Sequence, residues 1–221
     1  MKSTHPISRR ISQERIIAVL CIETAQDALQ TVAALVRGGV HAIELTLRTE
    51  RALEALSAVR EAFPDLLLGV GTVLRAKQID QVVASGADFA VAPGLNADVV
   101  RAAREVNLPF APGIMTPSEI EAALTLDCRV LKFFPAETSG GLKHLQTLSA
   151  PYRHLDLSFI PLGGIQTDNL STWLGSPLIS AVGGSWIAPA PLIAAGGWNQ
   201  IEANAAAAMK IVHETTPENN V

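Results

Sequence analysis

The chain has few of the residues that mark several common classes of protein. It contains two cysteines, one tyrosine and only 5% aromatic residues among 221. Cys21 and Cys128 lie far apart beside apolar residues, which predicts small core residues in a reducing compartment. The five histidines show no paired spacing and no nearby cysteine cluster. We therefore expect reduced cysteines, no metal site and no other cofactor.

Long apolar runs and clustered positive charge are also missing. No window approaches the roughly 18 consecutive apolar residues of a membrane span. The formal net charge is -4, and Arg9 and Arg10 are the only adjacent basic residues, which argues against nucleic-acid binding. The first ten residues lack the apolar stretch of a secretory signal. These features predict a cytoplasmic protein that binds neither membrane nor nucleic acid.

The chain does have 48% hydrophobic residues, in short apolar runs that alternate with longer amphipathic segments. At this length, the composition predicts one domain over residues 1–221. One helix is expected after the capping residue Thr24, and another after Thr116, where Pro117 and Glu119 complete the signature of a helix start. Eight runs are typical of strands, at 16–21, 42–46, 66–71, 89–93, 109–113, 130–134, 158–163 and 179–184.

Eight strand–helix units predict an α/β fold, a compact TIM (β/α)8 barrel with a short N-terminal helical arm. A doubly wound open sheet is the competing architecture, because it has the same alternating pattern. The glycine pair after the third strand, in G-V-G-T-V-L at 69–74, lacks the third glycine of a dinucleotide-binding fingerprint. The barrel is therefore favoured.

Lys132 is the most unusual residue, because it lies in the apolar run V-L-K-F-F, where a strand normally excludes an ammonium group. Burial disfavours the charged form of an amine, and a free amine can attack a carbonyl carbon. Side chains alternate along a strand, so Val130, Lys132 and Phe134 share one face, which we expect to be the barrel interior. An edge lysine that extends its tip to water is the alternative. The first interpretation makes Lys132 a Schiff-base nucleophile.

The run E-L-T-L-R places Glu44, Thr46 and Arg48 on one face near the end of a strand, where such barrels keep their active sites. A buried Glu44–Arg48 ion pair with only a structural role is the alternative. Glycine turns at 161–166 and 182–186 follow the last two strands, where TIM barrels often bind phosphate. Either turn alone would be an ordinary tight turn. Together they predict a phosphorylated substrate.

These motifs closely resemble those of the 2-keto-3-deoxy-6-phosphogluconate (KDPG) aldolase family, class I Schiff-base aldolases whose relatives also cleave 4-hydroxy-2-oxoglutarate (KHG). The resemblance runs from about residue 12 to residue 212 and implies a metal-independent carbon–carbon lyase of carbohydrate metabolism, in the Entner–Doudoroff pathway, assembled as a homotrimer. Its strongest motifs are the glycine turns and the segments 38–49 (G-G-V-H-A-I-E-L-T-L-R-T), 69–74 (G-V-G-T-V-L) and 132–137 (K-F-F-P-A-E).

The resemblance also implies roles for individual residues. Lys132 forms an imine with the C2 ketone, and cleavage of the C3–C4 bond gives pyruvate and glyceraldehyde 3-phosphate. Glu44 is implied as the acid/base group. The substrate-binding positions are implied to be Arg48 and Thr72 for the carboxylate, Pro93 and Phe134 for the pocket wall, and Gly163, Gly164, Gly184 and Ser185 for the phosphate.

The chain departs from the family pattern at Leu162, where many members have threonine, and at Cys21, where some have arginine. In the family, the first position lies near C4 of the substrate. Because the Leu162 side chain cannot form a hydrogen bond, phosphogluconate and phosphogalactonate substrates both stay open. KHG aldolase activity is the nearest alternative. A more distant alternative is a sugar-phosphate isomerase or epimerase with Glu44 as base. Another is a barrel without catalytic activity that binds phosphorylated ligands as a sensor.

Overall fold

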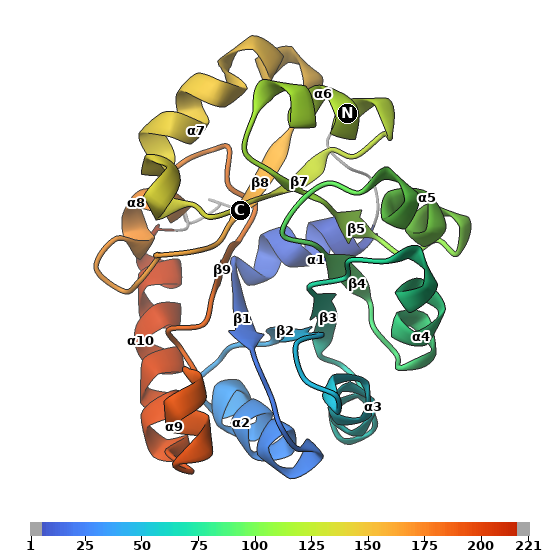
Figure 1. Ribbon diagram of the computed structural model, residues 1–221. Helices are drawn as coiled ribbons and strands as arrows, with labels where there is room; N and C mark the ends of the chain where they lie inside the picture. The colour runs from blue at the N-terminus through green and yellow to red at the C-terminus, as the bar shows by residue number, and fades with distance from the viewer. Residues whose placement is uncertain (1–5, 216–221) are drawn as a thin grey trace.

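The computed structural model describes residues 6–215, in which helices and parallel strands alternate along the chain (Figure 1). The strands are β1 (Ile16–Leu20), β2 (Ala42–Thr46), β3 (Leu67–Gly71), β4 (Phe89–Val91), β5 (Phe110–Ala111), β6 (Gly113–Ile114), β7 (Val130–Phe133), β8 (Ser158–Pro161) and β9 (Val182–Gly184). The α-helices are α1 (Pro6–Glu14), α2 (Ala25–Arg37), α3 (Ala52–Ala62), α4 (Ile79–Ala84), α5 (Ala97–Glu105), α6 (Pro117–Thr125), α7 (Gly141–Ser149), α8 (Leu170–Leu174), α9 (Ala190–Ala194) and α10 (Trp198–Thr215). Short 3₁₀ helices are η1 (Ala76–Gln78), η2 (Glu137–Ser139) and η3 (Ala150–Leu155).

The strands form two parallel sheets within the described residues. The larger sheet has six strands in the order β5-β4-β3-β2-β1-β9, and the smaller has the order β6-β7-β8. Figure 1 shows the larger sheet curling, with α2, α3, α4, α5 and α10 on its outside. Helical crossovers of this kind are what parallel strands require. The α/β class, the parallel strands and the N-terminal helix are therefore confirmed.

Two of the predicted strands differ in the structure. The run at 109–113 is divided into β5 and β6, because Pro112 between them has no N–H to donate to a neighbouring strand. The run at 179–184 becomes a strand only at Val182, although Ile179 makes an isolated parallel bridge with Phe159. The other six predicted strands are present, and their ends differ by two residues at most.

Helices α2 and α6 begin at the predicted capping residues. The Thr24 hydroxyl oxygen accepts the Asp27 N–H at 3.1 Å. The Thr116 hydroxyl oxygen accepts the Glu119 N–H at 3.3 Å, and the Glu119 carboxylate accepts the Thr116 N–H at 2.9 Å. These bonds satisfy N–H groups that the first helical turn leaves without partners. Local sequence therefore sets both boundaries.

The alternation of side chains along the strands separates two apolar cores. In β1, Ile16 and Leu20 pack with the helices, whereas Ile17 and Val19 belong to the interior that the strands enclose. Ile11 of α1 joins this interior core at the N-terminal ends of the strands. The interior is therefore apolar at one end, and its polar residues lie toward the C-terminal strand ends.

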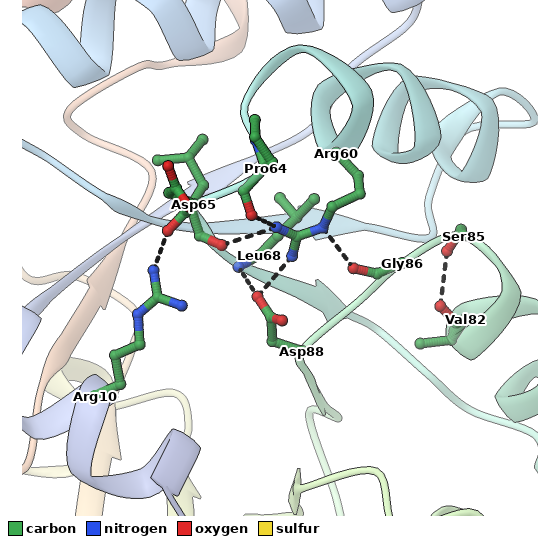
Figure 2. A network of polar contacts seen from close by, with 10 residues as sticks. Arg10, Arg60, Pro64, Asp65, Leu68, Val82, Ser85, Gly86 and Asp88 are labelled. Atoms are coloured by element: carbon green, nitrogen blue, oxygen red, sulfur yellow. Dashed lines mark hydrogen bonds and ion pairs between the residues drawn. The ribbon is translucent and has the colours of Figure 1, made fainter.

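A hydrogen-bond network fixes α3 against the N-terminal ends of β3 and β4 (Figure 2). The Arg60 guanidinium pairs with the Asp88 carboxylate at 2.6 Å, and the same carboxylate accepts the Leu68 N–H at 2.8 Å. Arg60 also donates to three backbone carbonyl oxygens at 2.7–3.1 Å, those of Pro64, Leu66 and Gly86. A single side chain thus connects a helix, two strands and the turns between them.

Candidate active site

Lys132 lies inside the fold, and its side chain is only 7% exposed. Its neighbours Leu131 and Phe133 are fully buried in the core beside the helices, whereas Val130 packs with the interior core. Alternation along β7 therefore turns Lys132 inward, as predicted. The alternative of an edge lysine with its tip in water is wrong.

Glu44 of β2 is the charged partner of Lys132. The distance from Lys132 Nζ to Glu44 Oε1 is 3.4 Å, and the Glu44 side chain is 2% exposed. The two residues come from different sheets and are 88 positions apart. Buried charges are costly unless they are paired, and here each group supplies a partner for the other. The pair holds an amine and a carboxylate close together in a site that is nearly closed to water.

Gly71 provides the space for the Glu44 carboxylate. A Cβ added to Gly71 would lie 1.8 Å from Glu44 Oε1, so any larger residue must displace the carboxylate. Gly71 pairs with Thr46 between β3 and β2, and the Thr46 hydroxyl donates to Leu20 O at 3.0 Å. Gly71 is absent from the predicted site residues. Its signal in the sequence is the G-V-G pair, whose first glycine lies opposite Glu44 on the neighbouring strand.

Arg48 and Thr72 follow the paired strands β2 and β3. Arg48 is exposed, and its Nε donates to the Thr46 hydroxyl at 3.1 Å. The alternative of a buried Glu44–Arg48 ion pair is wrong, because Glu44 pairs with Lys132 instead. Thr72 has a φ of 62°, a left-handed conformation that is uncommon for threonine and often found at functional sites. A guanidinium and a hydroxyl are therefore presented after adjacent strand ends.

Phe134 and Pro93 follow strands on the same side of the fold. The Phe134 ring centroid is 5.7 Å from Lys132 Nζ, a distance suited to a cation–π contact. Pro93 follows β4, and its carbonyl oxygen would lie 2.1 Å from a Cβ added to Gly113, the residue that pairs with Lys132. The loop after β4 therefore approaches the strand beside the lysine closely.

The first glycine turn follows β8, and the second overlaps β9. Gly163 and Gly164 have φ values of 99° and 82°, which glycine adopts without steric cost. Gly184 ends β9 and pairs with Ala18 of β1, and the exposed Ser185 follows it. All four predicted turn residues therefore lie at C-terminal strand ends, the side of the fold that carries the other site residues.

Leu162 directs its side chain into the interior core and is 6% exposed. It packs over Gly183, where an added Cβ would lie 2.7 Å from Leu162 Cγ. Cys21 directly follows β1 and is half-buried. At these two departures from the family pattern, the site therefore offers methyl groups and a thiol in place of a hydroxyl and a guanidinium.

A cavity of about 350 Å³ lies at the other end of the strands. It is lined mainly by apolar residues, with Cys128 in its wall and an Arg104–Asp127 ion pair of 2.8 Å beside it. It contains none of the predicted site residues. The reactive groups, rather than the size of a cavity, therefore locate the candidate site.

Within residues 6–215, no three metal-ligating side chains lie together, and no helix is long and apolar enough to cross a membrane.

A buried amine beside a carboxylate, between parallel strands of an α/β fold, is the arrangement expected of the class of α/β enzymes that act through a lysine nucleophile. Residues 7–204 match the model of the KDPG and KHG aldolase family, and the chain belongs to this family. A 2-dehydro-3-deoxy-phosphogluconate aldolase of Treponema pallidum (strain Nichols) is 41% identical over 93% of this chain and 97% of its own length.

Two solved structures of KDPG aldolases are also similar to this chain. KDPG aldolase from Legionella pneumophila, with pyruvate captured as a covalent carbinolamine, matches with a TM-score of 0.87 at 35% identity, over 92% of this chain and 98% of that one. The aldolase of Zymomonas mobilis ZM4 with 3-phosphoglycerate matches with a TM-score of 0.84 at 38% identity, over 92% and 94% of the two chains.

Proposed function

We propose that the protein is an aldolase that cleaves KDPG to pyruvate and glyceraldehyde 3-phosphate through an imine on Lys132. The observation that carries this proposal is the buried contact of 3.4 Å between Lys132 and Glu44. Membership of the KDPG and KHG aldolase family and the activity named for the Treponema relative support it. The carbinolamine in the Legionella structure supports a covalent mechanism.

In the proposed mechanism, the Lys132 amine attacks the C2 ketone, and Glu44 moves a proton from the nitrogen to the oxygen, directly or through a water molecule. The proton that Glu44 took from the Lys132 ammonium group, when it freed the amine, then goes to that oxygen, which leaves as water and gives an iminium ion. The Glu44 carboxylate then takes the proton of the C4 hydroxyl. The C3–C4 bond breaks, its electrons form an enamine, and the aldehyde leaves. Glu44 returns its proton to C3, and hydrolysis of the resulting iminium releases pyruvate and restores the Lys132 ammonium group.

The other predicted residues are proposed to bind the two ends of the substrate. Arg48 and Thr72 hold the carboxylate next to C2, since a guanidinium binds carboxylates with good geometry. Pro93 and Phe134 form the wall around the imine. At the opposite end, the phosphate accepts hydrogen bonds from the two glycine turns, at Gly163, Gly164, Gly184 and Ser185. The phosphorylated acid bound in the Zymomonas relative supports such a site.

The two sheets are further proposed to form one closed eight-stranded barrel. β5 and β6 are separated only by Pro112, whose carbonyl oxygen accepts the Lys132 N–H at 2.9 Å. At the other seam, the Ser180 N–H donates to Phe159 O at 3.0 Å. Both bonds support continuous pairing around the barrel. The single domain, the homotrimer and the cytoplasmic location stay predictions from the sequence and the family resemblance.

Trapping of the imine tests the aldolase proposal. The protein is incubated with pyruvate and sodium borohydride, and the product is examined by intact-protein mass spectrometry and peptide mapping. We expect a single reduced pyruvate adduct on Lys132 and no adduct in Lys132→Met. Lys143→Met, which removes an exposed lysine of α7, is the matched control and keeps the adduct. No adduct on the wild-type protein, or one on another lysine, would contradict the proposal.

Relative cleavage rates identify the substrate. If the glycine turns bind phosphate, kcat/KM is higher for KDPG than for KHG, which lacks the phosphate. A preference for KHG would remove the phosphate assignment and leave the lysine chemistry intact. The 6-phosphogalactonate analogue, assayed beside KDPG, measures the selectivity at C4 that accompanies Leu162.

A further inference from the structure

Glu137 ends the K-F-F-P-A-E motif and makes a hydrogen bond that the proposed mechanism does not use. Its Oε1 accepts the indole N–H of Trp173 at 2.6 Å. Trp173 is 1% exposed and belongs to α8, the first helix after the Gly163–Gly164 turn. Its ring lies 6.3 Å from that of Phe133 in the core. The bond therefore joins the loop after β7 to a fixed point in the helix after β8.

The Gly163–Gly164 turn lies directly against this connection. The Ala136 N–H donates to Leu162 O at 2.7 Å, and the Glu137 N–H donates to Gly163 O at 2.9 Å. A Cβ added to Gly164 would lie 2.7 Å from Glu137 Cβ. Two successive glycines with positive φ have no side chains of their own to limit their conformation. Their shape is therefore determined by what packs beside them, and Glu137 is part of that packing.

The charge of Glu137 does not explain its position. A carboxylate beside a phosphate repels it, and Glu137 makes no ion pair with a cation among residues 6–215. A hydrogen bond from a buried indole to a carboxylate is, however, strong and directional. The useful property of Glu137 at this place is thus an acceptor oxygen on a side chain of the right length.

We propose that Glu137 and Trp173 are positioning residues, which hold the Gly163–Gly164 turn in the shape that receives the phosphate of the substrate. This inference rests on the proposed function, which places the phosphate at that turn. Neither side chain touches the substrate. Their effect is on the recognition of the phosphorylated end, whereas the reaction at Lys132 proceeds without them.

The experiment compares kcat/KM for KDPG with kcat/KM for KHG, which uses the same lysine but has no phosphate. Trp173→Phe keeps a ring and removes the N–H donor, and Glu137→Ala removes the acceptor. We expect both variants to lower the KDPG to KHG ratio roughly tenfold or more, because each loses a hydrogen bond that involves a charged group. Glu137→Gln retains an acceptor oxygen without the charge and is expected to lower the ratio much less than Glu137→Ala does.

Tyr152→Phe is the matched control, since it also removes an aromatic donor to a carboxylate, the bond of 2.9 Å from Tyr152 to Glu121, but on another surface. Its ratio is expected to equal that of the wild-type protein. Trapping with pyruvate and borohydride shows that each variant retains its lysine chemistry. Should Trp173→Phe fail to fold, Glu137→Ala and Glu137→Gln together decide the outcome.

The possible results separate this inference from the function on which it rests. A wild-type protein without preference for KDPG overturns the phosphate site itself. If the wild-type protein prefers KDPG and the ratio is unchanged in Glu137→Ala, the positioning role alone is wrong. A fall in Glu137→Gln as large as that in Glu137→Ala also overturns it, because the carboxylate charge would then matter more than the acceptor.

Discussion

The Glu44 carboxylate occupies the volume that a methyl group on residue 71 would need, which predicts a large effect from a small substitution. Gly71→Ala is expected to move the carboxylate away from Lys132. Because a positioned acid/base group contributes roughly 10²–10⁴-fold to a rate, we expect kcat/KM on KDPG to fall by about 10²-fold or more. Steady-state assays of the purified variant measure this loss.

Gly94→Ala is the control for the Gly71→Ala prediction. A Cβ added to Gly94 meets no atom within 4 Å, and the loop that carries it lies on the same side of the fold. We expect rates close to those of the wild-type protein. If Gly71→Ala were as active as Gly94→Ala, the carboxylate would not need the position that the structure gives it.

The directions of Lys132 and Glu44 could be predicted from the sequence, because strand alternation fixes which face a side chain takes. The hydrogen-bond partner of Arg48 could not be predicted in this way. The chain leaves the strand after Thr46, the alternation ends there, and Arg48 lies at the surface. The space provided by Gly71 also depends on the register between β2 and β3, which no local pattern encodes.

At the scale of elements, the caps of α2 and α6 were predictable because each is set by residues within one turn of the helix. The start of β9 was not, because nothing within the run at 179–184 marks Val182 as the residue where pairing with β1 begins. Elements defined by neighbours in sequence are thus easier to predict than elements defined by partners in space.

The Arg60 network gives a prediction at this element scale. Arg60→Ala removes an ion pair and three bonds to carbonyl oxygens that join α3 to β3 and β4. We expect the free energy of unfolding to fall by about 2 kcal/mol, measured by urea denaturation with an unchanged m-value. Arg101→Ala, which breaks an exposed pair with Asp98 of 3.0 Å, should change it little. Equal effects of the two substitutions would contradict the role assigned to Arg60.

At the scale of the whole molecule, the regular alternation of apolar runs and amphipathic segments predicted the parallel α/β fold, because few other folds bury such a pattern. The division of the strands into two sheets at Pro112 was not predicted. Nor was the contact of Ile11 with the interior core, since its partners there lie on strands far from α1 in the sequence.

The folded structure as a whole also changes the pKa of the Cys128 thiol. Burial, with the Asp127 carboxylate nearby, raises the pKa of Cys128 from 9.0 to about 11. Folding therefore favours the neutral thiol, and the stability that this supplies is present below pH 9 and is lost as pH rises through about 11. We expect the free energy of unfolding to fall more steeply over this range in the wild-type protein than in Cys128→Ala.

Urea denaturation at a series of pH values measures this difference. Cys21→Ala keeps the Cys128 thiol and is expected to show the steeper wild-type fall. Identical slopes in the wild-type protein and Cys128→Ala would show that the thiol makes no contribution to the alkaline loss of stability.

Glu44 and Lys132 are 88 positions apart, so the two charges are synthesised at different times. Strands β1 to β4 leave the ribosome well before β7, and they carry the carboxylate without its cation. A lone buried charge is costly, so this first part of the sheet cannot exclude water around Glu44 by itself. The partner that offsets this cost, the Lys132 ammonium group, comes only with β7. Completion of the ion pair therefore requires both sheets, so the full desolvation of Glu44 depends on segments made early and late in synthesis.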